Sequence, residues 1–313
     1  MKISAIDIGS NTIKISVFDF DADSNVRPTE SFRKTVPAGL IGHIKNGVLT
    51  QNGTVILIDA LNVLSDFALS CGCPADRIYA FATAALRSVS DFGKLRQEIY
   101  SRTGLTIDLI SGEREAMLTF ESLMSVASTD RDGLLLDMGG GSTEVIAFDR
   151  RAPVNSRSLP FGALVLYRKF VRNILPTADE LERIGEYARS EFLTAGFIQD
   201  GFSELYINGG SGRALAQLIY SLKEGTDICP TLPCTLSAED LRSVAKRITD
   251  CDETVKQTLL RILPTRIHTA TPAAAAILSL MDITGNTDIE VTEAGIRASY
   301  IESILSKEGK FTI

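Results

Sequence analysis

Segments with a strand-like hydrophobic pattern alternate along this chain with segments that have a helix-like pattern. Runs that are apolar or alternate residue by residue, as in strands, occur within residues 5–19, 30–36, 77–87, 105–110, 134–149, 154–159, 204–210 and 289–291. Apolar residues at helical spacing occur within residues 54–69, 91–102, 111–124, 178–195, 213–222, 237–249, 253–262, 270–282 and 293–306. Strands that alternate with helices in this way predict an α/β protein with mixed sheets flanked by helices.

Two of the predicted helices carry start signals. Ser111 precedes a segment with Glu113 and Glu115 in its first turn, where a hydroxyl can cap the helix and acidic side chains suit its dipole. Thr177 and Glu180 form a capping-box pattern before the helix at 178–195.

One strand pattern occurs twice in the same register. Residues 5–19 read AIDIGSNTIKISVFD and residues 135–149 read LLDMGGGSTEVIAFD, so that Asp7 falls on Asp137 and Gly9 on Gly139. Each copy predicts a β-hairpin whose tip combines a carboxylate with glycine-rich backbone that a ligand can approach closely. Successive N–H groups in such a turn form an anion site, and the carboxylate can hold Mg²⁺ beside phosphate oxygens.

The repeat predicts two pseudo-symmetric domains with a cleft between them. We expect residues 1–122 together with about 297–313 in one domain, and residues 123–296 in the other. The boundary is placed where MSVASTDRDG turns polar before the second hairpin, and the last helix is expected to return to the first domain.

Composition narrows the class of protein. The 313 residues are 44% hydrophobic and carry a net charge of −7, which is typical of a globular protein and argues against a nucleic-acid binder. No apolar run approaches the roughly 18–20 residues that cross a bilayer, and the N-terminus enters a strand at once, so we expect a cytoplasmic protein without a signal peptide or membrane contact. Five cysteines fit reduced thiols, and neither cysteine pair has the usual C-x₂-C zinc spacing.

Carboxylates are the available general bases, because the chain has only two histidines and no Ser–His–Asp or Cys–His arrangement. Glu144 leaves the second glycine turn, and Glu115 opens a predicted helix. Arg87 ends the 77–87 segment and could clamp a phosphate. Each of these residues also has an ordinary structural interpretation. Glu144 could be a solvent-facing strand residue, Glu115 an acidic residue at a helix terminus, and Arg87 a surface arginine. A third glycine run, 209–212, lies between a strand and a helix, an arrangement that directs N–H groups at an anion.

Taken together, the motifs AIDIGSNTIK, ATAALR, LISGEREA, LLDMGGGSTEV, LPFGA, INGGSGR and VTEAGIR resemble the exopolyphosphatase/guanosine pentaphosphate phosphohydrolase family. This family belongs to the superfamily of actin, sugar kinases and heat-shock chaperone ATPases. The resemblance runs nearly end to end and implies two ribonuclease-H-like domains. The combination of ISG-x-x-EA with D-x-GGGSTE is specific, whereas the first hairpin is shared across the superfamily.

The resemblance implies a role for each matching residue. Glu115 is implied to activate the attacking water. The carboxylates implied to surround a Mg²⁺ or Mn²⁺ ion are Asp7, Asp137 and Glu144. The residues implied or expected to bind phosphate are Ser10, Asn11, Arg87, Gly139, Gly140, Gly141, Ser142, Thr143, Gly209, Gly210 and Ser211.

The sequence departs from the family pattern at a few points. Arg114 replaces an acidic residue before Glu115, the segment Pro37–Leu40 lacks an Arg-Leu-Gly pattern, and Ala298 stands where Glu-Gly usually follows the arginine. The chain also ends where longer members continue into a helical region, which implies the short two-domain form.

These features predict a metal-dependent phosphohydrolase that removes a terminal phosphoryl group from polyphosphate, with short chains expected. Guanosine pentaphosphate is the alternative substrate. A phosphotransferase driven by ATP and an alarmone-binding sensor are alternatives of another class. The oligomeric state is left open, with a homodimer as one alternative.

Overall fold

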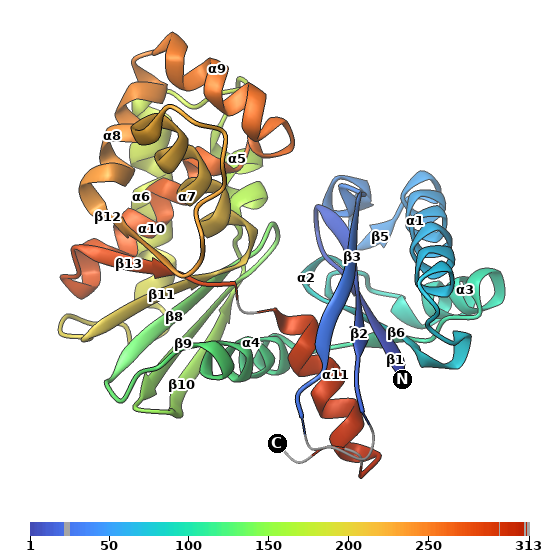
Figure 1. Cartoon of the computed structure of the whole chain (residues 1–313). Helices are drawn as coiled ribbons and strands as arrows, with labels where there is room; N and C mark the ends of the chain where they lie inside the picture. The colour runs from blue at the N-terminus through green and yellow to red at the C-terminus, as the bar shows by residue number, and fades with distance from the viewer. Residues whose placement is uncertain (22–25, 294, 310, 312–313) are drawn as a thin grey trace. The chain divides into compact units, whose positions relative to one another are not determined.

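The computed structural model describes residues 1–21, 26–293, 295–309 and 311. The chain divides into two compact units: unit 1 comprises Met1–Ser122 and Gly295–Ile313, and unit 2 comprises Leu123–Ala294. Each unit has its own sheet and its own helices (Figure 1).

Unit 1 contains a five-stranded sheet in the order β3-β2-β1-β6-β7. Its strands are β1 (Lys2–Ile8), β2 (Thr12–Asp19), β3 (Thr29–Pro37), β6 (Ile78–Ala82) and β7 (Ile107–Leu109). The first three strands form an antiparallel meander, and β6 and β7 continue the sheet in parallel with β1. The short strands β4 (Ile44–Lys45) and β5 (Val48–Leu49) form a separate pair.

Helices cover both faces of this sheet. They are η1 (Leu40–His43), α1 (Gln51–Ser70), η2 (Ala75–Arg77), α2 (Ala84–Arg87), α3 (Phe92–Thr103), α4 (Gly112–Val126) and α11 (Ile296–Lys307). Alternation along β1 explains the two faces: Ile6 and Ile8 join a core with α1, whereas Ile3 and Ala5 join a second core with α11.

Unit 2 contains a six-stranded sheet in the order β10-β9-β8-β11-β13-β12. Its strands are β8 (Gly133–Met138), β9 (Thr143–Asp149), β10 (Ala152–Leu159), β11 (Glu204–Asn208), β12 (Cys234–Ser237) and β13 (Asp288–Val291). Again an antiparallel meander, β8-β9-β10, is followed by strands parallel to β8, here β11 and β13, and the edge strand β12 pairs antiparallel with β13.

The helices of unit 2 pack on one side of this sheet in a single large core. They are α5 (Ala163–Phe170), α6 (Ala178–Leu193), α7 (Gly209–Glu224), α8 (Ala238–Thr249), α9 (Glu253–Ile262), η3 (Pro264–Arg266) and α10 (Ala270–Thr284). Leu134, Leu136 and Met138 of β8 point into this core, which leaves Leu135 and Asp137 on the opposite face.

The predicted α/β class is confirmed, with mixed sheets flanked by helices. Ser111 Oγ accepts from the N–H of Arg114 at the start of α4, and the capping box at Thr177 and Glu180 forms. The sequence pattern missed α5 and β12, which are short. The third glycine run was predicted as a turn, but Gly209 begins α7 directly after the strand.

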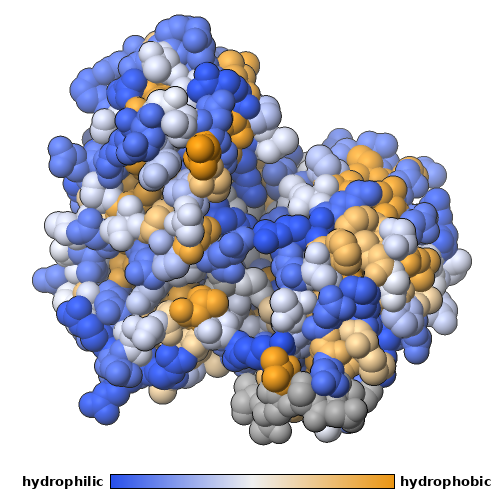
Figure 2. Space-filling model, in the orientation of Figure 1, coloured by the Kyte–Doolittle hydropathy of each residue, from blue (hydrophilic) through white to orange (hydrophobic). Residues whose placement is uncertain are grey.

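The expectation that no apolar run approaches membrane-spanning length is wrong for one helix among the described residues: α1 is long and apolar enough by length and composition alone, which is weak evidence for a membrane span. Leu57, Leu61 and Leu64 of α1 are fully buried in the core of unit 1, as expected for a core helix. On the face drawn in Figure 2, hydrophilic residues predominate and apolar ones occur in small groups.

Candidate active site

The first hairpin turn lies at the carboxyl ends of three parallel strands of unit 1. Thr83, after β6, donates its N–H to Ile8 O of β1, and Ile110, after β7, donates to Ala82 O of β6. The turn after β1, the start of α2 and the start of α4 therefore share one end of the sheet. In open α/β sheets this is the end at which ligands bind.

The two hairpins close their turns with the same backbone hydrogen bond. Gly9 N donates to Thr12 O at 3.2 Å, and Gly139 N donates to Ser142 O at 3.0 Å. These positions are equivalent in the sequence repeat, so the repeat extends to backbone geometry.

The carbonyl groups of both turns are held by neighbouring backbone. The N–H groups of Ala38 and Gly39 donate to Asn11 O in the first turn. In the second turn, the first residues of α5 donate to Gly139 O and Gly140 O. Gly162 must be glycine for this contact, because a Cβ there would lie 2.6 Å from Gly139 O.

The N–H groups of the turns are left for another partner. Among the described residues, no backbone carbonyl accepts from the N–H groups of Ser10, Asn11, Gly140 or Gly141. Asn11, Gly140 and Gly141 are partly exposed, while Ser10 is buried. Consecutive N–H groups without acceptors form a concave site of positive potential, which suits phosphate oxygens.

The second hairpin places two carboxylates opposite each other. Asp137 of β8 pairs with Glu144 of β9 in the antiparallel register, which puts both side chains on one face. Glu144 is 1% exposed, and its Oε1 accepts from Ser158 Oγ at 2.7 Å. Carboxylate oxygens are the ligands that a hard cation such as Mg²⁺ prefers, so the donor chemistry of this pair fits such an ion.

The equivalent aspartate of the first hairpin has cationic neighbours. Asp7 pairs across the strands with Lys14, the position that Glu144 occupies in the second copy. Arg297 Nη1 of α11 also lies 3.7 Å from Asp7 Oδ2. The two hairpins share a backbone but differ in local charge.

Glu115 and Arg87 meet at the same end of the unit 1 sheet. Arg87 Nη1 donates to Glu115 Oε2 at 2.6 Å and to Ile110 O at 3.1 Å. The side chains are 21% and 13% exposed, for Arg87 and Glu115 respectively. Glu115 also lies in the first turn of α4, where the helix dipole favours an ionised carboxylate. This carboxylate is oriented and partly exposed to water, as a general base requires.

The third glycine run contacts the second hairpin through Asp137. A Cβ on Gly209, whose φ is +91°, would lie 2.6 Å from Asp137 Oδ1, so only glycine fits here. Asn208 Nδ2 approaches Asp137 Oδ2 at 3.5 Å, and Ser211 Oγ donates to Met138 O. The N-terminus of α7 therefore lies beside the Asp137 carboxylate.

Two predicted phosphate ligands have structural contacts instead of exposed hydroxyl groups. Thr143 is fully buried and donates to Phe161 O at 2.6 Å, and Ser211 is 2% exposed. Their hydroxyl groups hold the turns in shape, so a contribution to phosphate binding would come from backbone N–H groups.

A profile of the Ppx/GppA phosphatase family matches residues 43–308. The chain belongs to this family. The match contains Arg87, Glu115 and the whole second hairpin, while the first hairpin lies before it. The family expected from the sequence motifs is thereby confirmed.

Similar proteins agree with this assignment. Exopolyphosphatase 1 of Mycobacterium tuberculosis is 26% identical over 248 residues, which are 78% of this chain and 71% of that protein. A crystal structure of an exopolyphosphatase from Cytophaga hutchinsonii has a TM-score of 0.83 at 20% identity and covers 100% of both chains. The Ppx/GppA family member of Aquifex aeolicus has a TM-score of 0.78 at 19% identity and covers 98% of both chains.

The predicted residues of this family member divide between the two units. Unit 1 holds Asp7, Ser10, Asn11, Arg87 and Glu115, and unit 2 holds Asp137, Gly139, Gly140, Gly141, Ser142, Thr143, Glu144, Gly209, Gly210 and Ser211. Within the described parts of the chain, no three His, Cys, Asp or Glu side chains gather closely enough to hold a metal. Asp137 and Glu144, which pair across β8 and β9, are the two predicted metal ligands that lie in unit 2.

Sequence reasoning missed Arg266, which lies against the start of α7. Its guanidinium occupies the space where a Gly210 side chain would be, and no carboxylate partner is seen for it among the described residues. Desolvation, together with the charge of Arg213, lowers the pKa of Arg266. Its only sequence signal is an isolated arginine after Leu263-Pro264, which does not differ from a surface residue.

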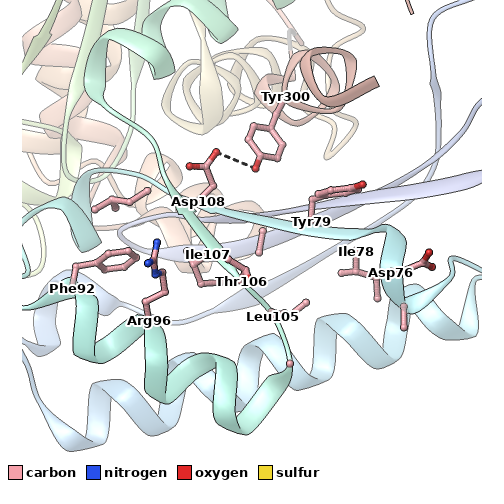
Figure 3. Close-up of a pocket in the computed structure, with 14 residues that line it drawn as sticks. Asp76, Ile78, Tyr79, Phe92, Arg96, Leu105, Thr106, Ile107, Asp108 and Tyr300 are labelled. Atoms are coloured by element: carbon pink, nitrogen blue, oxygen red, sulfur yellow. Dashed lines mark hydrogen bonds between the residues drawn. The ribbon is translucent and has the colours of Figure 1, made fainter. Parts of the chain in front are cut away.

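A separate cavity of about 630 Å³ lies at the free edge of β7 in unit 1 (Figure 3). Tyr79, Asp108 and Tyr300 contribute polar groups, and Phe92 and Ile107 contribute apolar ones. None of the predicted site residues lines it, so we do not assign it to the candidate active site.

Proposed function

We propose that this protein is an exopolyphosphatase, a hydrolase that releases orthophosphate from the end of inorganic polyphosphate. The observation that carries the proposal is the pair of hairpin turns, each of which has an aspartate near its strand end and two consecutive N–H groups with no backbone acceptor among the described residues. Membership of the family supports hydrolysis of phosphoanhydride bonds. Because similar proteins are named exopolyphosphatases, we propose polyphosphate rather than guanosine pentaphosphate as the substrate.

Glu115 is the proposed general base. The oxygen of a water molecule forms a bond to the terminal phosphorus, and the bond from this phosphorus to the bridging oxygen breaks. Glu115 accepts a proton from the water, and the bridging oxygen leaves with the shortened chain. Arg87 Nη1 donates to the Glu115 carboxylate at 2.6 Å, and the position of Arg87 beside the base also suits the charge on the phosphoryl oxygens.

The turn N–H groups are proposed to bind phosphate oxygens. Ser10 and Asn11 supply them in unit 1, and Gly140 and Gly141 supply them in unit 2. Arg266 adds a positive charge beside the N-terminus of α7, which strengthens anion binding in unit 2.

Asp137 and Glu144 are the residues proposed to hold a divalent cation, Mg²⁺ or Mn²⁺. Such a cation supplies charge neutralisation for the phosphates when bound, and water and phosphate oxygens would complete its ligand set. The Ser158 hydroxyl fixes the orientation of Glu144. We also propose a cytoplasmic location, which the five free cysteines support.

The test is phosphate release measured side by side on tripolyphosphate, long-chain polyphosphate, guanosine pentaphosphate and ATP. Each reaction is run with Mg²⁺, with Mn²⁺ and with a chelator. We expect the highest kcat/KM on a polyphosphate and loss of turnover with the chelator. Preference for guanosine pentaphosphate, or transfer from ATP without release of phosphate, would contradict the proposal.

A further inference from the structure

Arg297 lies in the first turn of α11, which is an unfavourable position for a cation. The N–H groups at a helix N-terminus carry partial positive charge, so cations are favoured at the opposite end. Arg297 is the second residue of α11, and no acidic residue shares its first turn. A residue that breaks a local preference in this way indicates a compensating contact elsewhere in the fold.

The compensating contacts are with the first hairpin. Arg297 Nε donates to Ser16 Oγ at 2.6 Å, and Arg297 Nη1 lies 3.7 Å from Asp7 Oδ2. The Arg297 and Asp7 side chains are 15% and 14% exposed, and Ser16 is fully buried. Because little water reaches these groups, the attraction between the charges is only weakly screened.

The rest of α11 fixes the place from which Arg297 reaches the hairpin. Tyr300, Ile301 and Leu305 pack in one core with Ile3 and Ala5. Tyr300 Oη donates to Asp108 Oδ2 at 3.3 Å, and Figure 3 marks this hydrogen bond with a dashed line. Residues 297, 300, 301 and 305 follow one helical face. Arg297 thus lies on the same face of α11 as these buried residues, at the N-terminal end of the helix.

The second hairpin has a different residue at the position of Ser16. The position of Ser16 corresponds to Ile146, which is fully buried and apolar. Asp137 instead has Glu144 across the strands and Asn208 at 3.5 Å. The first hairpin therefore differs from the second in having a polar residue, Ser16, at this position, and Ser16 is the residue that accepts the hydrogen bond from Arg297.

We propose that Arg297 is a positioning residue for Asp7. It holds the carboxylate in one orientation and offsets its charge, so α11, although almost 300 residues away in sequence, completes the first hairpin. This inference rests on the proposed function, because it assumes that Asp7 takes part in hydrolysis.

The test compares Arg297→Gln, Arg297→Lys and a matched control, Lys307→Gln, which removes one positive charge from the exposed end of the same helix. We expect Arg297→Gln to lower kcat roughly 10- to 100-fold, the range for residues that orient a site from behind, with a smaller change in KM. Arg297→Lys should recover part of the loss, because it keeps the charge but not the two-point contact. Lys307→Gln should leave kcat and KM unchanged. The proposal would be overturned if Arg297→Gln and Arg297→Lys lowered kcat equally, or if KM changed as much as kcat. A loss of kcat in Lys307→Gln would also overturn it.

A double-mutant cycle separates this inference from the proposed function. In an Asp7→Asn background, Arg297→Gln should add little to the loss of kcat, because both changes remove one interaction. Additive losses in kcat would overturn the positioning role. Urea unfolding of the same four proteins tests the contact without any activity, and coupling between the two changes is expected there. If the wild-type protein released no phosphate from polyphosphate, the proposed function would fail, while absence of coupling in unfolding would contradict the inference itself.

Discussion

Asp7 and Asp137 occupy equivalent backbone positions but have neighbours of opposite charge. Asp7 faces Lys14 across the strands and Arg297 from α11, whereas Asp137 faces Glu144. The residue paired with the aspartate across the strands is therefore basic in the first hairpin and acidic in the second. The duplication provided the turn geometry, and single substitutions on the adjoining strands set the local charge.

Glu115→Gln should lower turnover by roughly a hundred- to ten-thousand-fold, the usual contribution of a general base. The amide keeps the shape and the hydrogen bond from Arg87 but cannot accept the proton from water. KM should change far less. The measurement is phosphate release under saturating polyphosphate.

Glu113→Gln is the matched control for Glu115→Gln, since Glu113 lies in the same first turn of α4 and is exposed. It should retain wild-type turnover. Retention of more than about a tenth of the activity by Glu115→Gln, an effect below ~1.4 kcal/mol, would reduce Glu115 to a helix-terminus residue.

Asp137→Asn and Glu144→Ala should each raise the Mg²⁺ concentration needed for half-maximal activity, because a hard cation needs charged oxygen ligands. The measurement is a metal titration at fixed polyphosphate. Asp149→Asn serves as the control, since Asp149 is an exposed carboxylate at the end of the same strand as Glu144. Unchanged titrations in both site variants would locate the cation elsewhere.

At the scale of elements, α4 and α11 each carry a glutamate whose carboxyl group is at least partly buried. Glu302 of α11 is 4% exposed, and Arg27 Nη1 lies 3.6 Å from its Oε1. Burial raises the pKa of Glu302, more than the Arg27 charge lowers it, and the Glu121 carboxylate adds to the rise. Burial also raises the pKa of Glu121 on α4. The packing of α4 and α11 therefore buries two carboxyl groups, and this burial raises the pKa of both.

The free energy of unfolding should therefore fall as pH rises from the ordinary carboxyl range through the raised pKa of Glu302. In that window the folded state holds more protons than the unfolded state, which gives a negative slope. Glu302→Gln should remove this part of the slope, so that the variant gains stability relative to wild type at pH 8 but not at pH 4. Urea unfolding across this range measures the difference.

Glu98→Gln is a suitable control for the pH effect. Glu98 lies 3.6 Å from Arg102, the same separation as in the Arg27–Glu302 pair, but its side chain is 50% exposed. Its unfolding curves across the same pH range are the reference for removal of a carboxyl group at an exposed position. A Glu302→Gln curve that runs parallel to wild type would contradict the argument from burial.

At the scale of the whole molecule, the net charge of −7 bears on how a polyanion is handled. The turn N–H groups can bind only a few phosphates, and each further phosphate meets a surface that is on average negative. We therefore predict a preference for short polyphosphates and release of the substrate between cleavages. Binding should weaken only slightly with salt, because few cationic contacts are screened.

A chain-length ladder on a gel at partial digestion tests this prediction, with Glu115→Gln as the inactive reference. Uniformly shortened intermediates are expected. Disappearance of full-length chains without intermediates would show processive action on long polymer.

The sequence by itself determined the features that depend on short-range backbone chemistry. The Asp-x-Gly pattern and the alternating strands determined both hairpins and their register, because side chains in a strand alternate with a period of two. Ser111 and Thr177 determined two helix starts through their own hydroxyl groups. The roles given to Glu115, Asp137 and Glu144 remain predictions, supported by positions at the strand ends where ligands bind.

Only the tertiary structure decided which distant side chains meet. The contacts of Arg87 with Glu115, of Ser158 with Glu144 and of Arg297 with Asp7 join residues on separate elements, and no local pattern specifies such pairs. The burial of Thr143 and the desolvation of Arg266 likewise depend on how α5 and η3 pack. Sequence periodicity shows which face of an element is apolar. The partner opposite a polar residue on that face follows from packing, which depends on the whole fold.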